Sequence, residues 1–176
     1  MLNRLNHPVY LISERADGHN FSFTTVHGVE YLVYFAEADG YVPSASFASH
    51  TRMLGFTPLR GTFREGERLP NDAAAWPTIF EILYLYMSRY PDTVLLYVCS
   101  DVGVWDSTKR HPRFAKKRSE VFAEKCELWQ QTGVMPAVKI DYGLYGSLYC
   151  SCVFRSGNPY ESEIRQVIHQ TTLEKQ

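Results

Sequence analysis

The chain has 176 residues, a net charge of −1 and a hydrophobic share of 45%. This near-neutral balance excludes a molecule that binds polyanions through its overall charge, so such a role would need a local basic patch. The 12 tyrosines and 10 phenylalanines favour half-buried sheet surfaces and exclude a disordered chain. The length predicts a single domain over residues 1–176.

Compartment signals are absent from the sequence. The most apolar stretch, residues 79–87, is too short to cross a membrane and contains Glu81. The N-terminus lacks the continuous apolar core of a signal peptide. Four cysteines in a chain without an export signal are typical of buried, reduced thiols. We therefore expect a cytoplasmic protein that makes no membrane contact.

The N-terminal third predicts antiparallel strands. Apolar or alternating segments are separated by Asp-Gly and His-Gly turns, at residues 8–14, 21–25 and 29–35. Residues 41–55 are rich in small and polar side chains, which predicts a loop with a short helical turn. A fourth strand is expected over residues 56–64, with Pro58 near its start.

Helical and strand patterns alternate in the remainder. A cap at Asn71-Asp72 and a proline at position 77 predict a mostly covered helix that ends before Pro91. Asn158, Pro159 and Glu161 give a capping pattern for the last helix. The other elements are expected at 94–99, 112–131, 135–141 and 147–155, with a frayed tail at 171–176. The fold class is therefore α+β, a mostly antiparallel sheet of about six or seven strands with three main helices.

The strongest functional signal is a basic cluster where a buried strand gives way to a helix. An anion at a helix N-terminus is favoured by the helix dipole and by unpaired backbone amides. The alternative is a solvated helix face that pairs with Glu120 and Glu124. Six cations lie within ten residues: Lys109, Arg110, Arg113, Lys116, Lys117 and Arg118.

The connection before this helix holds the other candidates. Asp101 and Asp106 are weak candidates for a general base, although loop aspartates are more often turn formers. Trp105, if exposed, would contact a ligand or partner. Cys99 is a weak candidate nucleophile with His111 as its base, and buried packing is the alternative. No spacing of cysteines or histidines predicts a metal site, and no cofactor is expected.

A motif-like pattern runs from Tyr97 to Asp101 and continues with Asp106, Lys109-Arg110 and Arg113-Phe114. This pattern resembles a motif of a bacterial domain-of-unknown-function family. That family is found mostly in Bacteroidetes. The segments 145–148 and 158–159 resemble its C-terminal part, as does Asp72 before Thr78-Ile79. The likeness spans about residues 70–170. Because the family is uncharacterised, the resemblance implies no activity.

The order of elements is similar to the core of the acetyl-coenzyme A-dependent N-acyltransferase fold. In that family the cofactor pyrophosphate lies on amides at the first of these helices, after an Arg/Gln-x-x-Gly-x-Gly/Ala turn. The matching stretch here, from Arg64 to Leu69, holds one glycine and has Glu67 inside the turn. No tyrosine lies between Asp101 and Gln131 to serve as the family's usual acid. The resemblance thus implies the fold with the cofactor site lost.

The sequence leads to one main hypothesis and two alternatives. The main one is a binding protein whose basic surface, with Lys109, Arg110, Arg113, Lys117 and Trp105, contacts an anionic small molecule or protein partner. The alternatives are a divergent acyl-coenzyme A-dependent N-acyltransferase and a nucleic-acid-associated factor. The sequence leaves the oligomeric state and the identity of the ligand open.

Overall fold

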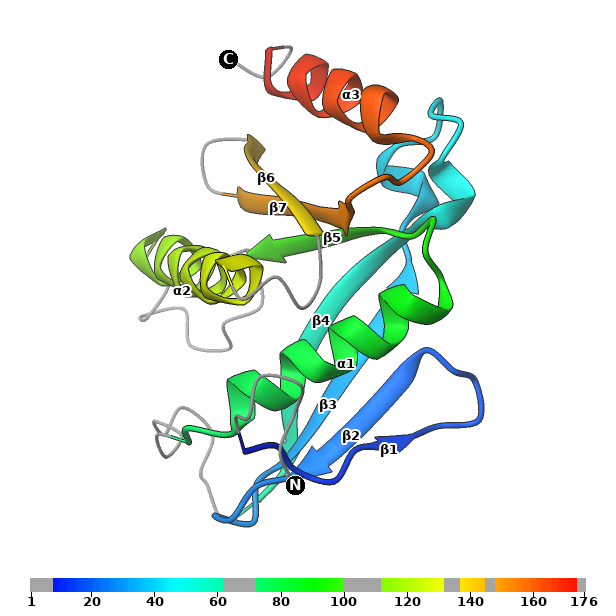
Figure 1. Ribbon diagram of the computed structural model, residues 1–176. Helices are drawn as coiled ribbons and strands as arrows, with labels where there is room; N and C mark the ends of the chain where they lie inside the picture. The colour runs from blue at the N-terminus through cyan, green and yellow to red at the C-terminus, as the bar shows by residue number, and fades with distance from the viewer. Residues whose placement is uncertain (1–7, 62–71, 100–111, 132–136, 145–147, 174–176) are drawn as a thin grey trace. The chain divides into compact units, whose positions relative to one another are not determined.

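The computed structural model describes residues 8–61, 72–99, 112–131, 137–144 and 148–173 (Figure 1). The chain divides into two compact units. The first unit is Met1–Ala36 with Leu54–Tyr90, and the second unit is Glu37–Met53 with Pro91–Gln176.

The described residues form seven strands, three α-helices and two short 3-10 helices. The strand order is β1-β2-β3-β4-β5-β7-β6. The pairs β1–β2, β2–β3, β5–β7 and β6–β7 are antiparallel, and β4–β5 is parallel. In chain order the elements are β1 (Ser13–Glu14), β2 (Asn20–Thr24), β3 (Glu30–Glu37), η1 (Asp39–Tyr41), η2 (Ala48–His50), β4 (Thr51–Arg60), α1 (Ala75–Arg89), β5 (Val94–Cys99), α2 (Pro112–Gln131), β6 (Ala137–Leu144), β7 (Leu148–Arg155) and α3 (Glu161–Leu173).

The α+β class, the mostly antiparallel sheet and the three main helices are as predicted. The bounds of β5 and α2 agree with the expected 94–99 and 112–131. These two elements have strong local signals. β5 is a short run of apolar residues, and α2 has a proline in its first turn and apolar residues at helical spacing.

In the first unit, α1 packs on the sheet through aromatic rings. Tyr86 stacks on Phe35 of β3 with ring centroids 3.6 Å apart, and Phe21 of β2 meets the same tyrosine edge-on at 6.4 Å. All three rings are at most 3% exposed. The alternation of β2, with buried Phe21 and Phe23 on either side of half-buried Ser22, places both rings on one face, where Phe21 meets the helix.

Local backbone contacts determine where α1 begins and ends. Asp72 Oδ1 accepts hydrogen bonds from the amides of Ala74 and Ala75, at 2.9 and 3.1 Å. Asp72 therefore holds the turn that leads into α1, two residues before the N-cap residue Ala74. At the other end the amide of Tyr90 donates to Tyr86 O, and Pro91 follows.

Within α1, Thr78 is fully buried, and its hydroxyl donates to Ala74 O and accepts from the Tyr10 amide. Leu85 of the same helix is 38% exposed. Two expectations for the first unit were wrong. The first strand spans only Ser13–Glu14 instead of 8–14. Pro58 lies near the end of β4.

In the second unit, α2 packs on β5 and β7, and α3 packs on the opposite face of the same strands and on β6 (Figure 1). Val94 and Leu96 of β5 belong to the same buried cluster as Ile164 and Ile168 of α3. Tyr97, which alternates with them, contacts Phe122 of α2 at a centroid distance of 4.1 Å. The strand is buried on both faces, which is why its sequence is a continuous apolar run.

The segment 41–55 combines the expected helical turn with an unexpected strand start. The short helices η1 and η2 lie at Asp39–Tyr41 and Ala48–His50. β4 begins at Thr51, five residues earlier than predicted. Residues Thr51–Met53 pair in parallel with Val94–Leu96, so tertiary pairing extends the strand into a stretch of weak local signal.

The last helix extends farther than expected. Residues Thr171–Leu173 were predicted to fray but continue α3. No helix among the described residues is long and apolar enough to pass through a bilayer.

Candidate functional site

Most of the predicted site residues lie outside the described parts of the chain. These are Asp101, Trp105, Asp106, Lys109, Arg110 and His111. The structure therefore tests neither the two aspartates as bases nor Trp105 as a contact residue. What it does describe is the strand that leads into this connection and the helix that leaves it.

Cys99 is the last residue of β5 and is 3% exposed. It pairs with Tyr149 of β7 and lies on the same face of β5 as Tyr97, the face that α2 covers. This location agrees with the packing alternative for Cys99. A buried thiol beneath a helix is poorly placed to attack a substrate.

The other cysteines share this environment. All four, Cys99, Cys126, Cys150 and Cys152, are buried and form no disulfide. Burial raises the pKa of the Cys152 thiol to about 12, so this side chain remains protonated at physiological pH. Among the residues that the structure describes, no three histidine, cysteine or acidic side chains are grouped to hold a metal ion.

The helix α2 places the described part of the basic cluster in its first two turns. Pro112 is its first residue, so Arg113 and Lys117 follow within that region. Nine residues separate Arg113 from buried Phe122, which at 3.6 residues per turn is about half a revolution. The positions of Arg113 and Lys117 therefore fall on the side of α2 opposite its packed stripe of Phe122, Cys126 and Trp129.

The acidic residues of α2 concern the alternative, a solvated helix face whose cations pair with glutamates of the same helix. Glu124, which the alternative pairs with the basic cluster, forms an ion pair with Lys125 at 3.8 Å. Glu120 also makes a contact, and like Glu124 it is exposed. Exposed ion pairs of this kind contribute little to stability.

The start of α1 bears on the acyltransferase resemblance. Its first amides are occupied by Asp72 Oδ1, while Asp72 Oδ2 accepts a 2.7 Å hydrogen bond from the Tyr10 hydroxyl. The Tyr10 oxygen in turn accepts from the amide of Val26 at 3.1 Å. A carboxylate thus takes the position where the resemblance would put a pyrophosphate, and two anionic groups there would repel each other.

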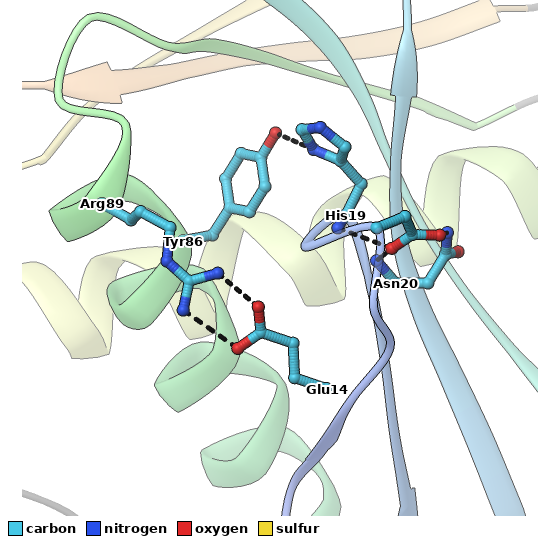
Figure 2. A network of polar contacts seen from close by, with 6 residues as sticks. Glu14, His19, Asn20, Tyr86 and Arg89 are labelled. Atoms are coloured by element: carbon cyan, nitrogen blue, oxygen red, sulfur yellow. Dashed lines mark hydrogen bonds and ion pairs between the residues drawn. The ribbon is translucent and has the colours of Figure 1, made fainter.

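The structure also brings together polar residues that the sequence analysis did not connect. Figure 2 shows Arg89, at the end of α1, with both guanidinium nitrogens on the Glu14 carboxylate, one of them at 2.9 Å. Beside this pair, His19 Nδ1 lies 2.9 Å from the Tyr86 hydroxyl, and its ring stacks on Tyr90 at 5.7 Å. This cluster links the turn after β1 to the last turn of α1.

Electrostatics within this cluster follow from the contacts. The hydrogen bonds from Arg89 lower the pKa of Glu14, and the same pairing raises the pKa of Arg89. The amide of His19 donates to Asp17 and lowers the pKa of that carboxyl. Every charged group here has a partner within the cluster, so we interpret it as a structural link between β1 and α1. Only the Asp17-Gly18 turn was visible in the sequence.

A second unpredicted contact lies in the second unit. The Glu163 carboxylate of α3 accepts hydrogen bonds from both the amide and the hydroxyl of Ser46, the amide at 2.8 Å. Nearby, His50 Nε2 lies 3.3 Å from the Tyr160 hydroxyl. These bonds attach the segment of short helices to the start of α3. The pairs are more than 100 residues apart in sequence, so no local pattern could indicate them.

No protein-family model matches this chain, and neither a curated protein nor a solved structure matches it.

Proposed function

We propose that this protein works by binding, and that the first two turns of α2 hold an anionic group of a small molecule or protein partner. The supporting observation is the placement of Arg113 and Lys117 on the side of α2 opposite Phe122. The packed stripe of the helix is apolar, with Phe122, Cys126 and Trp129 buried. The basic positions lie where the buried strand β5 leads into α2.

The energetics of the helix end favour this function. Cations near a helix N-terminus oppose the helix dipole, at a cost of about 0.3–1 kcal/mol each. A bound phosphate or carboxylate would offset this cost through the cations and the backbone amides together. Lys109, Arg110 and Trp105 precede the helix in sequence and would complete the same surface.

A charge-reversal experiment tests this function. We expect Arg113→Glu with Lys117→Glu to weaken retention on phosphocellulose, so that the variant elutes at lower salt than the wild type. The matched control is Arg60→Glu with Arg165→Glu, which makes the same change in net charge elsewhere. Arg60 is 85% exposed in its side chain, and Arg165 pairs with Glu161. Equal elution of the two double variants would overturn the proposal.

The salt dependence of binding separates a nucleic-acid partner from a small anion. A single-stranded oligonucleotide that contacts several cations should lose affinity steeply as salt rises. Binding that inorganic phosphate displaces with a shallow salt dependence indicates a small anionic group instead. Mass spectrometry of the natively purified chain would then identify the bound molecule.

The second candidate is a divergent acyl-coenzyme A-dependent N-acyltransferase. It is favoured by the parallel pair β4–β5, joined through α1 and followed by α2 and the β6–β7 hairpin, which is the core order of that fold. Asp101 or Asp106 would be its base. Asp72 at the start of α1 argues against a pyrophosphate in the usual position.

Thermal denaturation with coenzyme A tests this candidate. A ligand that binds only the folded state raises the melting temperature, by an amount that grows with its concentration relative to its dissociation constant. We expect no shift for the wild type, because Asp72 repels the pyrophosphate. A concentration-dependent rise that Arg113→Glu with Lys117→Glu leaves unchanged would favour the enzyme over the anion-binding surface.

A further inference from the structure

The strand β6 ends the sheet order within the described residues. It pairs with β7 over its whole length, from Ala137 opposite Arg155 to Leu144 opposite Leu148. No described strand pairs with its other side. An eight-residue strand at this position presents a row of backbone groups that another strand can pair with, and it contains no proline to prevent this.

The sequence of β6 has a symmetric charge pattern. Successive residues of a strand alternate between faces, so Lys139 and Asp141 share one face, on either side of Ile140. Val138, Ile140 and Tyr142 share the other face. In the β6–β7 register that second face is also the face of Phe154, Cys152 and Cys150, which belong to the buried cluster with α3.

We propose that β6 pairs antiparallel with β6 of a second copy of this chain, with Ile140 on the two-fold axis. In this register Lys139 of each copy stands opposite Asp141 of the other, and Val138 stands opposite Tyr142. The pairing is isologous, as closed dimers require, and it contains two oppositely charged cross-strand pairs.

Geometry and charge together disfavour the two neighbouring registers. An antiparallel two-fold perpendicular to the sheet keeps each residue on its own face, so only registers that slip by an even number of residues are compatible. A slip of two residues in one direction places Lys139 opposite Lys139 of the other copy. A slip in the other direction places Asp141 opposite Asp141. Both slips set like charges directly opposite each other, which destabilises a strand pair.

Charge-swap variants test the dimer by sedimentation equilibrium of the full chain. We expect the wild type to dimerise with rising concentration. Lys139→Asp or Asp141→Lys alone replaces both attractive pairs with like charges, so each should raise the dissociation constant at least about tenfold. The double variant Lys139→Asp/Asp141→Lys restores the pairs and should dimerise as the wild type does.

Mixing the two single variants gives a sharper result. Each variant alone should be largely monomeric, while an equimolar mixture should form heterodimers, because two aspartates on one strand then face two lysines on the other. Circular dichroism of each variant reports whether the chain is folded, and the double variant serves as a composition-matched control. A wild type that stays monomeric at every accessible concentration would overturn the proposal. So would a mixture that stays as dissociated as its separate components.

Discussion

Gly55 of β4 lies against the ring of Tyr34 from β3. A Cβ atom added at Gly55 would overlap that ring, with the ring carbons and the hydroxyl oxygen of Tyr34 as its nearest neighbours. Side chains in a packed sheet cannot move apart without loss of other contacts. Gly55 is therefore required by the close approach of an aromatic neighbour within the first unit.

We predict that Gly55→Ala lowers the free energy of unfolding by about 1–3 kcal/mol, the usual range for overpacking. Gly40→Ala is the matched control, since a Cβ there meets nothing within 4 Å, and it should change stability by less than about 0.5 kcal/mol. Urea denaturation measures both. If the overlap is the cause, Gly55→Ala should cost less in a Tyr34→Ala background. Equal effects of the two glycine variants would contradict this explanation.

Some single-residue features could be predicted from the sequence and others could not. Gly28, expected in a hairpin turn, has a φ of 72° and donates its amide to Thr25 O. That prediction depends only on neighbours in the chain. The approach of Tyr34 to Gly55 depends on how β3 and β4 pair, and no local pattern specifies this register.

At the scale of elements, Asn158 connects the start of α3 to Thr93, the residue before β5. Its Oδ1 accepts from the Tyr160 amide at 2.9 Å, and its Nδ2 donates to Thr93 O at 3.4 Å. The residue is 5% exposed. It was expected as a cap, and it also satisfies a carbonyl 65 residues earlier in the chain.

We predict that Asn158→Ala lowers the free energy of unfolding by about 1–2 kcal/mol, through loss of the capping bond and of the partner of Thr93 O. Asn158→Asp keeps the capping acceptor but lacks the donor, so its effect separates the two contributions. Hydrogen exchange of the first turn of α3 provides a local measurement. Unchanged protection there in Asn158→Ala would show that the cap does not determine where the helix begins.

The accuracy of the element predictions followed the strength of local signals. β5 and α2 combine clear periodicity with clear ends, and their bounds were correct. β4 was predicted too late because Thr51–Gly55 contains a glycine and polar residues, and only its pairing with β5 reveals a strand. The site was predicted as a basic helix start, and the helix is present. The cations that precede the helix lie outside the described residues.

At the scale of the whole molecule, carboxylates in both units couple folding to pH. Hydrogen bonds lower the pKa of Glu14 and Asp17 in the first unit and of Glu163 in the second. The partners are Arg89 for Glu14, the His19 amide for Asp17 and Ser46 for Glu163. A lowered pKa means that the folded chain binds these protons less readily than the unfolded chain does.

This linkage determines the direction of the pH effect. Each carboxylate stabilises the fold at pH values above its ordinary pKa, 4.5 for glutamate and 3.8 for aspartate. That stabilisation is lost as the pH falls from there through the lowered folded value. Glu14 and Asp17 are exposed and Glu163 is half-buried, so each contribution is modest. Acid should therefore weaken both units without abolishing either one.

We predict that substitution separates the two units in their response to acid. Glu14→Gln with Asp17→Asn should lower the hydrogen-exchange protection of backbone amides in the first unit at neutral pH. The loss of that protection with acid should also become less steep. Glu163→Gln should do the same in the second unit. Hydrogen exchange followed by mass spectrometry, from about pH 7 to about pH 3, resolves the units by peptide. Glu127→Gln removes an exposed carboxylate of α2 and controls for the loss of a negative charge. If Glu163→Gln flattened the acid dependence of both units equally, stability would be shared across the chain. Effects confined to the substituted unit would instead show that each unit opens on its own.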